Sequence, residues 1–325
     1  MSGHPSPLLD HVGGQRARIE RALLDSVATT DAHLTELASH LIVAGGKRLR
    51  PVLTVISGSV DGRPVTDDVV LGGVSCELVH LGSLYHDDVM DESETRRGVE
   101  TVNARWGNLQ AILAGDFLLA RASEIAAGLG TEVAGLLART IGWLCEGQIE
   151  ELRHTYDVGR SEESYLASIH GKTASLYGTA ARVGGLVAGL DGDEIDALTD
   201  YGNAYGMVFQ IVDDLLDLTA SDDRLGKRAG HDMEVGVYTL PVIHTMAAGS
   251  DELADLLGGP IDGDRSARAL EIVRNGPGIG SSVERAQTFA AHAVTACSRL
   301  APGPARTALE AAPAALLATV LSPTG

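Results

Sequence analysis

The longest apolar repeats of this chain follow the 3.6-residue period of an α-helix, and this pattern limits the possible folds more than any other feature. Four such stretches run for about 20 residues each. They cover 66 to about 90, 109 to about 127, 131 to about 153 and 193 to about 218. Clusters rich in Gly, Pro or Asp separate helical stretches at 45–46, 61–64, 128–130 and 157–160. Long helices joined by short turns predict an all-α helical bundle.

Composition agrees with this prediction. Hydrophobic residues make up 44% of the chain but aromatic residues only 4%. Ala, Leu, Val and Gly suit close helix packing better than a β-sandwich, whose strands favour aromatic and β-branched residues. The candidate linkers at 258–264 and 275–280 are short enough to be turns between helices. We therefore predict a single domain over residues 1–325.

The charge balance and the cysteines narrow the function classes. Acidic residues outnumber basic ones by 44 to 25, which argues against nucleic acid or an anionic membrane as the main partner. Cys76, Cys145 and Cys297 are widely spaced, so neither a disulfide framework nor a zinc site is indicated. The N-terminus has no signal-peptide pattern, and no apolar run reaches the roughly 18 residues of a membrane span. We expect a soluble, cytoplasmic protein.

The acidic pattern DDxxD occurs twice, at 87–91 and at 213–217. On a helix, the first and last aspartates of each copy lie one turn apart on the same face. A solvated acidic surface is the simplest explanation of one such pattern, but apolar residues such as Leu84 and Phe209 precede these two. Facing carboxylate pairs offer the oxygen ligands that Mg²⁺ prefers together with phosphate oxygens. The two motifs therefore predict magnesium and a diphosphate ligand.

Basic residues stand where such a ligand would need them. Only three lysines occur, Lys47, Lys172 and Lys227, and each follows a glycine. Arg96 and Arg97 follow the first acidic motif within one or two helical turns. Lysine meets phosphate as a compact charge and arginine as a planar fork. We expect these residues to bind the diphosphate, although chance placement at loop edges is the alternative.

Together these motifs resemble the trans-polyprenyl diphosphate synthases, the head-to-tail chain-elongating enzymes of isoprenoid biosynthesis. The resemblance runs from about residue 45 to residue 241, with Gly-Gly-Lys-Arg-Leu-Arg-Pro at 45–51, His-Asp-Asp-Val-Met-Asp-Glu-Ser at 86–93, Gly-Asp-Phe at 115–117, Gly-Gln at 147–148, Lys-Thr at 172–173, Phe-Gln-Ile-Val-Asp-Asp at 209–214 and Gly-Lys at 226–227. It implies an isoprenoid-synthase-type helical bundle around a central cavity. It also implies a homodimer with both acidic motifs at the mouth of that cavity.

The resemblance implies a role for each motif residue. About three Mg²⁺ ions per active site are implied. Their implied ligands are Asp87, Asp88, Asp91, Asp213 and Asp217. The implied catalytic set adds Asp214 and Lys172. Arg96, Lys172 and Lys227 match positions that hold the allylic diphosphate. Lys47, Arg50, His80 and Arg97 match the isopentenyl diphosphate pocket, and Thr173 and Gln210 complete the substrate-binding set.

The implied reaction is a prenyl transfer that gives an all-trans polyprenyl diphosphate. Pyrophosphate leaves the allylic substrate, the double bond of isopentenyl diphosphate attacks the allylic cation, and a proton is lost. Metal ions and basic side chains stabilise the departing charge, so no protein nucleophile is required. One position departs from the family pattern, because Val237 stands where a second lysine is usual. Losing that charge should weaken the binding of diphosphate or metal.

Small residues below Asp87 predict a long product. Going down the helix from Asp87, these residues are Ser83, Gly82, Val79 and Cys76. Each helical turn descends about 5.4 Å, which is close to the length of one isoprene unit. In the family an aromatic residue just below the motif accompanies short products, so its absence implies about twenty carbons or more. The surrounding motif resembles the synthases that make quinone side chains. Helix packing is the alternative reason for the small residues, and Phe117, Leu118 or a partner subunit could still form a floor.

Three alternatives remain. A class I terpene cyclase would share the fold, but such enzymes usually line the pocket with aromatic residues. A non-catalytic or regulatory subunit of a heteromeric synthase is favoured by Val237 and opposed by the intact acidic motifs. A ferritin-like carboxylate bundle would bind its metals with Glu-x-x-His pairs and further glutamates, whereas the acidic pattern at the centre of this interpretation is the repeated DDxxD.

Overall fold

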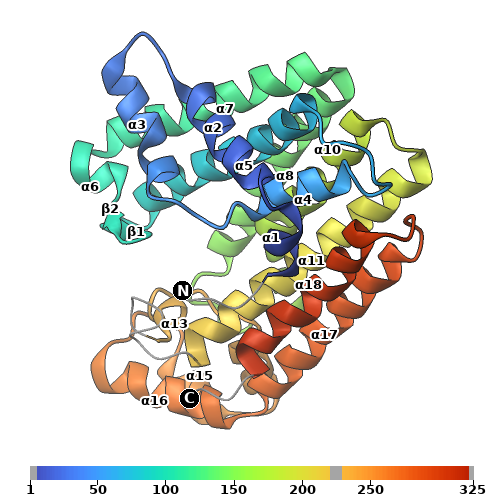
Figure 1. Ribbon diagram of the computed structural model, residues 1–325. Coiled ribbons are helices and arrows are strands. Elements are labelled where there is room, and N and C mark those ends of the chain that lie inside the picture. Colours follow the sequence, from blue (N-terminus) through green and yellow to red (C-terminus); the bar gives the residue numbers. More distant parts are fainter. Residues whose placement is uncertain (1–5, 220–228, 322–325) are drawn as a thin grey trace.

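Residues 6–219 and 229–321 are described by a computed structural model, and they form a bundle of helices with one short hairpin (Figure 1). The helices before residue 190 are α1 (Pro7–Val12), α2 (Gln15–Val27), α3 (Ala32–Val43), α4 (Leu49–Ser57), α5 (Asp67–Met90), α6 (Val102–Trp106), α7 (Asn108–Leu129), α8 (Thr131–Arg153), α9 (Glu162–Ile169) and α10 (Ser175–Ala188). A π-helical turn, η1 (His170–Ala174), joins α9 to α10. The later helices are α11 (Gly192–Thr219), α13 (His231–Glu234), α14 (Leu240–Ala247), α15 (Asp251–Leu256), α16 (Gly263–Asn275), α17 (Gly278–Cys297) and α18 (Pro304–Leu321).

The four long stretches predicted from periodicity are helices α5, α7, α8 and α11, with ends within about two residues of the expected ones. Local chemistry explains where they begin and end. The Thr66 hydroxyl accepts a hydrogen bond from the backbone N–H of Val69 at 3.2 Å, and Asp67 and Asp68 place negative charge in the first turn of α5. Gly130, with φ +128, separates α7 from α8 in a conformation that other residues rarely adopt. The predicted helical bundle is confirmed.

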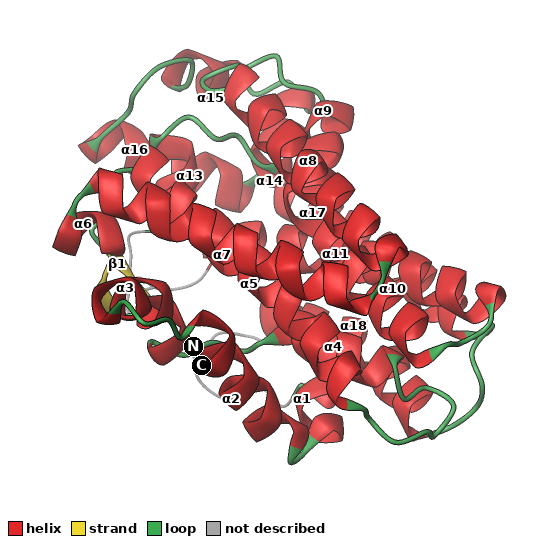
Figure 2. Ribbon diagram, turned by 90° about the horizontal axis from the view of Figure 1, so that it is seen from above, coloured by secondary structure: helices red, strands yellow, loops and turns green. Residues whose placement is uncertain are grey.

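Helix α5 lies at the centre of the molecule and packs against α4, α7 and α10. Figure 2 shows α5 and α7 running side by side. Helix α11 packs against α10, α17 and α18 and contributes to three buried clusters, with Ile195 in one, Val208 in the next and Leu218 in the third. Burying one such side chain is worth about 1.5–3 kcal/mol. The core is therefore organised along α5 and α11, the two helices that carry the acidic motifs.

The chain between α5 and α6 forms a β-hairpin that the sequence did not predict. Strands β1 (Thr95–Arg96) and β2 (Val99–Glu100) pair antiparallel. Arg97 and Gly98 form the turn with φ of 55° and 79°, and positive φ at both positions is what a type I′ turn requires. Strands this short have no apolar period to detect. Arg96 and Arg97 thus follow the first acidic motif on a hairpin rather than on further helical turns.

Among the described helices, none combines the length and the apolar character needed to cross a bilayer.

Candidate active site

The first acidic motif lies where α5 ends. Asp87 is partly buried, Asp88 is only 1% exposed, and Asp91 is exposed just beyond Met90, the last residue of the helix. Acidic groups at a helix C-terminus oppose the helix dipole. Burial also raises the pKa of both Asp87 and Asp88. The positive charge that the sequence requires here comes from residues outside α5.

Arg96 neutralises Asp88 from the hairpin. Its Nε donates to Asp88 Oδ1 at 2.6 Å, and Asn103 Nδ2 donates to the Asp88 carbonyl at 3.1 Å. Asp88 Oδ2 has no hydrogen-bond partner among the described residues. Asp88 is therefore a buried carboxylate that orients Arg96, while Asp87 and Asp91 are the more accessible carboxylates of this motif.

Lys172 faces the first motif from the π-helical turn η1. Its Nζ donates to Glu151 Oε1 of α8 at 2.7 Å. Burial alone would lower the pKa of the Lys172 ammonium, but the charges of Glu151 and Asp87 outweigh burial and raise it. Helix α8 reaches η1 closely because residue 147 is glycine: a Cβ at Gly147 would lie 2.4 Å from the backbone nitrogen of Lys172. The sequence analysis missed Glu151, whose signal is its place one turn after Gly147 on the same helix face.

The second acidic motif lies inside α11. Asp213 is exposed, whereas Asp214 and Asp217 are 5% and 4% exposed. Asp214 accepts two hydrogen bonds from neutral groups, one from Gln210 Nε2 at 2.8 Å and one from the Tyr165 hydroxyl at 2.6 Å. Burial, and then the charge of a neighbouring aspartate, raises the pKa of Asp214. Tyr165 was not predicted as a site residue.

Turn η1 connects the two motifs. Thr173 Oγ1 donates to Gln210 Oε1 at 2.8 Å, and Gln210 in turn holds Asp214. The preceding residue, Lys172, acts on Asp87. One short turn therefore carries a charge that acts on Asp87 and a hydroxyl that bonds to the residue holding Asp214. The extra residue of a π-helical turn is frequent at functional sites.

A basic cluster lies beside the first motif. Arg50 is 8% exposed, its Cζ is 4.6 Å from the centre of the Tyr177 ring, and its Nε has no hydrogen-bond partner among the described residues. Arg97 Nη1 donates to the carbonyls of Leu41 and Gly45. Burial, then the charges of Arg50 and Arg97, holds the pKa of His80 well below its usual range. Several cations so close together favour an anionic ligand.

Of the two remaining predicted lysines, Lys47 and Lys227, only the first is among the described residues. Lys47 is exposed on the turn before α4, and Lys227 lies outside the described residues. Arg48, which the sequence analysis did not single out, is 2% exposed and donates to Glu77 Oε1 at 3.2 Å. This buried ion pair fixes the turn that carries Lys47 and Arg50.

The predicted chain-length positions lie on α5 below the first motif. Cys76 and Val79 are buried, and a Cβ at Gly82 would lie 3.0 Å from the carbonyl oxygen of Gly115. Ser83 Oγ donates to the His80 carbonyl of its own helix at 2.9 Å. Gly82 thus has a packing role between α5 and α7. The assignment of these four residues to a product tunnel stays a prediction.

The carboxylates fit a metal that is shared with a ligand. Among the described residues, no three His, Cys, Asp or Glu side chains lie close enough to hold an ion alone. Asp87 is partly buried, and Asp91 and Asp213 are exposed to solvent. Mg²⁺ is usually bound by one or two carboxylates together with phosphate oxygens and water. The donor set therefore suits Mg²⁺ when a diphosphate completes the coordination.

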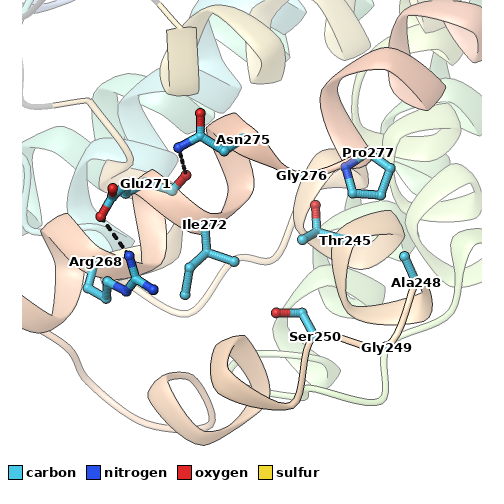
Figure 3. A pocket seen from close by; sticks show the side chains of 10 residues that line it. All are labelled: Thr245, Ala248, Gly249, Ser250, Arg268, Glu271, Ile272, Asn275, Gly276 and Pro277. Atoms are coloured by element: carbon cyan, nitrogen blue, oxygen red, sulfur yellow. Dashed lines mark hydrogen bonds and ion pairs between the residues drawn. The ribbon is translucent and has the colours of Figure 1, made fainter.

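Two open cavities lie away from these residues. The first, of about 380 Å³, is lined by residues of α14 and α16 and of the turns that follow these helices, including Thr245 and Arg268 (Figure 3). Arg268 is already paired with Glu252 and Glu271. The second, of about 460 Å³, borders the turn before α5. Neither cavity is lined by a residue of the acidic motifs or of the basic cluster, so neither is the candidate active site.

Comparison with known proteins identifies the family. Residues 31–273 match the model of the Polyprenyl synthetase family. Nonaprenyl diphosphate synthase of Mycobacterium tuberculosis is 40% identical over 299 residues, which are 91% of this chain and 89% of that protein. Octaprenyl diphosphate synthase of Escherichia coli is 34% identical over 298 residues, 90% and 92% of the two chains. The crystal structure of a polyprenyl synthase from Caulobacter crescentus, complexed with calcium and isoprenyl diphosphate, has a TM-score of 0.90 at 32% identity and covers 98% of this chain and 99% of that one.

An all-α bundle with an aspartate motif on each of two core helices defines a class of isoprenoid-synthase-type enzymes. The chain belongs to the polyprenyl synthetase family and is a prenyltransferase of isoprenoid biosynthesis. The predicted family, fold class and enzyme class are confirmed.

Proposed function

We propose that this enzyme condenses isopentenyl diphosphate with an allylic diphosphate and releases an all-trans polyprenyl diphosphate and pyrophosphate. The observation that carries the proposal is turn η1, whose Lys172 ammonium lies near enough to Asp87 of one acidic motif to oppose the rise of its pKa on burial, and whose Thr173 donates to Gln210 beside the other. A leaving diphosphate bound beside this turn meets carboxylates from two helices and the Lys172 ammonium.

In this proposal the metal ligands are Asp87, Asp91, Asp213 and Asp217, and Asp88 supports them through its ion pair with Arg96. About three Mg²⁺ ions would act as Lewis acids that stabilise the charge on departing pyrophosphate. The Caulobacter crescentus relative, complexed with calcium and isoprenyl diphosphate, supports a divalent cation in this chain also.

Arg96, Lys172 and Lys227 hold the allylic diphosphate. The raised pKa of Lys172, produced by Glu151 and Asp87 against the effect of burial, keeps its ammonium charged at neutral pH. Arg96 is oriented by Asp88. Arg96 and Lys172 are thus each positioned by an acidic partner before the substrate arrives, which reduces the entropy lost on binding.

Lys47, Arg50, His80 and Arg97 bind isopentenyl diphosphate. The buried Arg50 guanidinium keeps an unused Nε donor among the described residues. The lowered pKa of His80 makes the imidazole neutral at pH 7, so it contributes hydrogen bonding rather than charge. Thr173 and Gln210 fix each other at 2.8 Å and complete the substrate-binding set between the two diphosphates.

The product is a chain of about twenty carbons or more, of the kind used as a quinone side chain, since each helical turn of α5 matches about one isoprene unit. The small side chains at Cys76, Val79, Gly82 and Ser83 support this length. The two sequence relatives, named nonaprenyl and octaprenyl diphosphate synthase, support it independently.

We further propose that residues 1–325 form one domain and that the enzyme is a cytoplasmic homodimer. The passage of α11 through three buried clusters supports one domain. Leu109 and Leu113 of α7 are 79% and 65% exposed, which supports a partner subunit on this helix. Light scattering of the purified protein would measure the mass of the assembly.

The deciding experiment incubates the purified protein with isopentenyl diphosphate, Mg²⁺ and allylic primers of increasing length, followed by mass spectrometry. We expect a ladder of linear polyprenyl diphosphates. No elongation by the isolated chain would favour a regulatory subunit, and a cyclic hydrocarbon would favour a terpene cyclase.

A further inference from the structure

Arg160 is a buried guanidinium in the turn between α8 and α9. The residue is 4% exposed, and its Nη1 donates to the Tyr238 carbonyl at 3.1 Å. Its Cζ lies 5.7 Å from the centre of the Tyr165 ring. Neither Nε nor Nη2 has a hydrogen-bond partner among the described residues. A buried cation with unused donors is costly unless nearby negative charge compensates it.

The negative charge around Arg160 belongs to the active site. Burial lowers the pKa of Arg160, and the strongest opposing charge is Glu151, with Asp214 also contributing. Glu151 is the carboxylate that holds Lys172. Tyr165, whose ring lies beside the guanidinium, donates its hydroxyl to Asp214 at 2.6 Å. Arg160 therefore lies beside Tyr165, which holds Asp214 of the second acidic motif, and within the electrostatic influence of Glu151, which holds Lys172.

Arg160 also lies against the segment where the family pattern has a lysine and this chain has Val237. The carbonyl that accepts from Arg160 belongs to Tyr238, the next residue. On the other side of Val237, the Gly236 carbonyl accepts from the backbone N–H of Tyr156 at 2.9 Å. The segment that carries Arg160 is thus hydrogen-bonded to the residues immediately before and after Val237, the position that lacks a charge.

We propose that Arg160 supplies to the second acidic motif the positive charge that position 237 lacks, and that pyrophosphate binding at this motif depends on it. Arg160 acts as a positioning residue, because it orders Tyr165 and Asp214 and places a charge where little water screens it. The inference rests on the proposed function, since it assumes that the diphosphate lies between the two motifs.

The test measures the affinity of inorganic pyrophosphate in the presence of Mg²⁺ by calorimetry. We expect Arg160→Met to weaken binding roughly tenfold, as for the loss of one charged hydrogen-bonding group, and Arg160→Lys to retain most of it. Adding Val237→Lys to Arg160→Met should restore the lost affinity. A purely structural role for Arg160 predicts no such rescue. Unchanged affinity in Arg160→Met, or no recovery in the double variant, overturns the proposal.

The matched control is Arg306→Met. Arg306 also donates to a backbone carbonyl, that of Leu300 at 3.0 Å, but it lies on α18, and its loss should leave pyrophosphate affinity unchanged. Circular dichroism and thermal unfolding check that each variant is folded. If Arg160→Met does not fold, Arg160→Gln removes the charge and keeps a donor for the Tyr238 carbonyl.

Failure of this inference is separable from failure of the proposed function. If the wild-type protein elongates primers but its pyrophosphate affinity does not depend on Arg160, only the inference is wrong. If pyrophosphate binding depends on Arg160 and is rescued by Val237→Lys while no primer is elongated, only the proposed reaction is wrong. The KM for the allylic diphosphate should rise in Arg160→Met more than kcat falls.

Discussion

At the first acidic motif the partners of Asp88 and Asp87 carry permanent charge, whereas the two side chains that hold Asp214 at the second motif are neutral. Arg96 pairs with Asp88 at 2.6 Å and Lys172 acts on Asp87. Asp214, in contrast, is held by a hydroxyl and an amide. Burial raises the pKa of both Asp88 and Asp214, but the Arg96 guanidinium opposes this rise at Asp88 more than the neutral donors oppose it at Asp214. Identical spacing in the sequence therefore does not give identical electrostatics, because the neighbours come from other elements.

The two motifs also differ in where the helix that carries them ends. Helix α5 ends at Met90, so Asp91 already belongs to the turn that leads into the hairpin. Helix α11 continues to Thr219, beyond its whole motif. The first motif therefore pairs with Arg96 of the following hairpin, whereas Asp214 of the second is held by Gln210 of α11 itself and by Tyr165 of α9.

The largest expected effect is the loss of a metal ligand at the first motif. Asp87→Asn should lower kcat/KM by roughly 100- to 1000-fold, because an amide is a weaker ligand for Mg²⁺ and leaves the departing charge less stabilised. Primer elongation at saturating Mg²⁺ measures it. Asp196→Asn is the control, since Asp196 is an exposed acid of α11 paired with Arg182, and its activity should not change. A near-normal rate for Asp87→Asn would show that the first motif is not the metal site.

The next largest effect is a loss of stability when the ion pair between Arg96 and Asp88 is broken. Arg96→Met leaves the Asp88 carboxylate buried without its partner, so the free energy of unfolding should fall by about 2 kcal/mol. Equilibrium urea unfolding measures this loss. Adding Asp88→Asn should recover part of it, which a double-mutant cycle quantifies. An unchanged urea midpoint would mean that Arg96 does not stabilise the first motif.

A smaller effect is expected where the partner is neutral. Tyr165→Phe removes one of the two donors to Asp214 and should lower the free energy of unfolding by about 1 kcal/mol. Tyr201→Phe is a matched control, because its hydroxyl also makes a single buried bond, to the Leu309 carbonyl at 2.9 Å. Both variants should lose similar stability in urea, but only Tyr165→Phe should reduce the rate of elongation. Equal activity in the two variants would separate Tyr165 from the site.

The smallest effect is a pH dependence caused by the burial of His80, and secondarily by the arginines near the first motif. Burial and the charges of Arg50 and Arg97 lower the pKa of His80 in the folded protein. The unfolded chain therefore takes up a proton below about pH 6.5 while the folded protein does not. The stability from a neutral His80 is present above that pH and is lost as the pH falls toward the lowered folded-state pKa. Urea unfolding from about pH 7.5 to about pH 5.5 should show wild-type stability falling relative to His80→Gln. A constant difference between the two would contradict this.

The long helices could be predicted because their signals are local. Helix α5 is apolar and buried over most of its length, and Thr66 marks its start by capping the first turn. Both acidic motifs could be placed on helices for the same reason. The family resemblance then supplied an expected role for each basic residue.

The partners of the motifs could not be predicted, because they depend on contacts between distant segments. Glu151 meets Lys172 only because Gly147 lets α8 approach η1. Tyr165 meets Asp214 across 49 positions of sequence. The hairpin at Arg96 is too short to show a period. Residue spacing identifies the groups that carry charge, but tertiary packing decides which group each one faces.

The hairpin turn has a consequence for how the enzyme tolerates insertions. Arg96 and Arg97 are adjacent, yet one guanidinium bonds to Asp88 and the other to the backbone around Gly45. This divergence comes from the two-residue turn, whose length sets the strand register and the face of every side chain. One added residue here would redirect both arginines at once, so natural variants of this loop should differ in residue type far more often than in length.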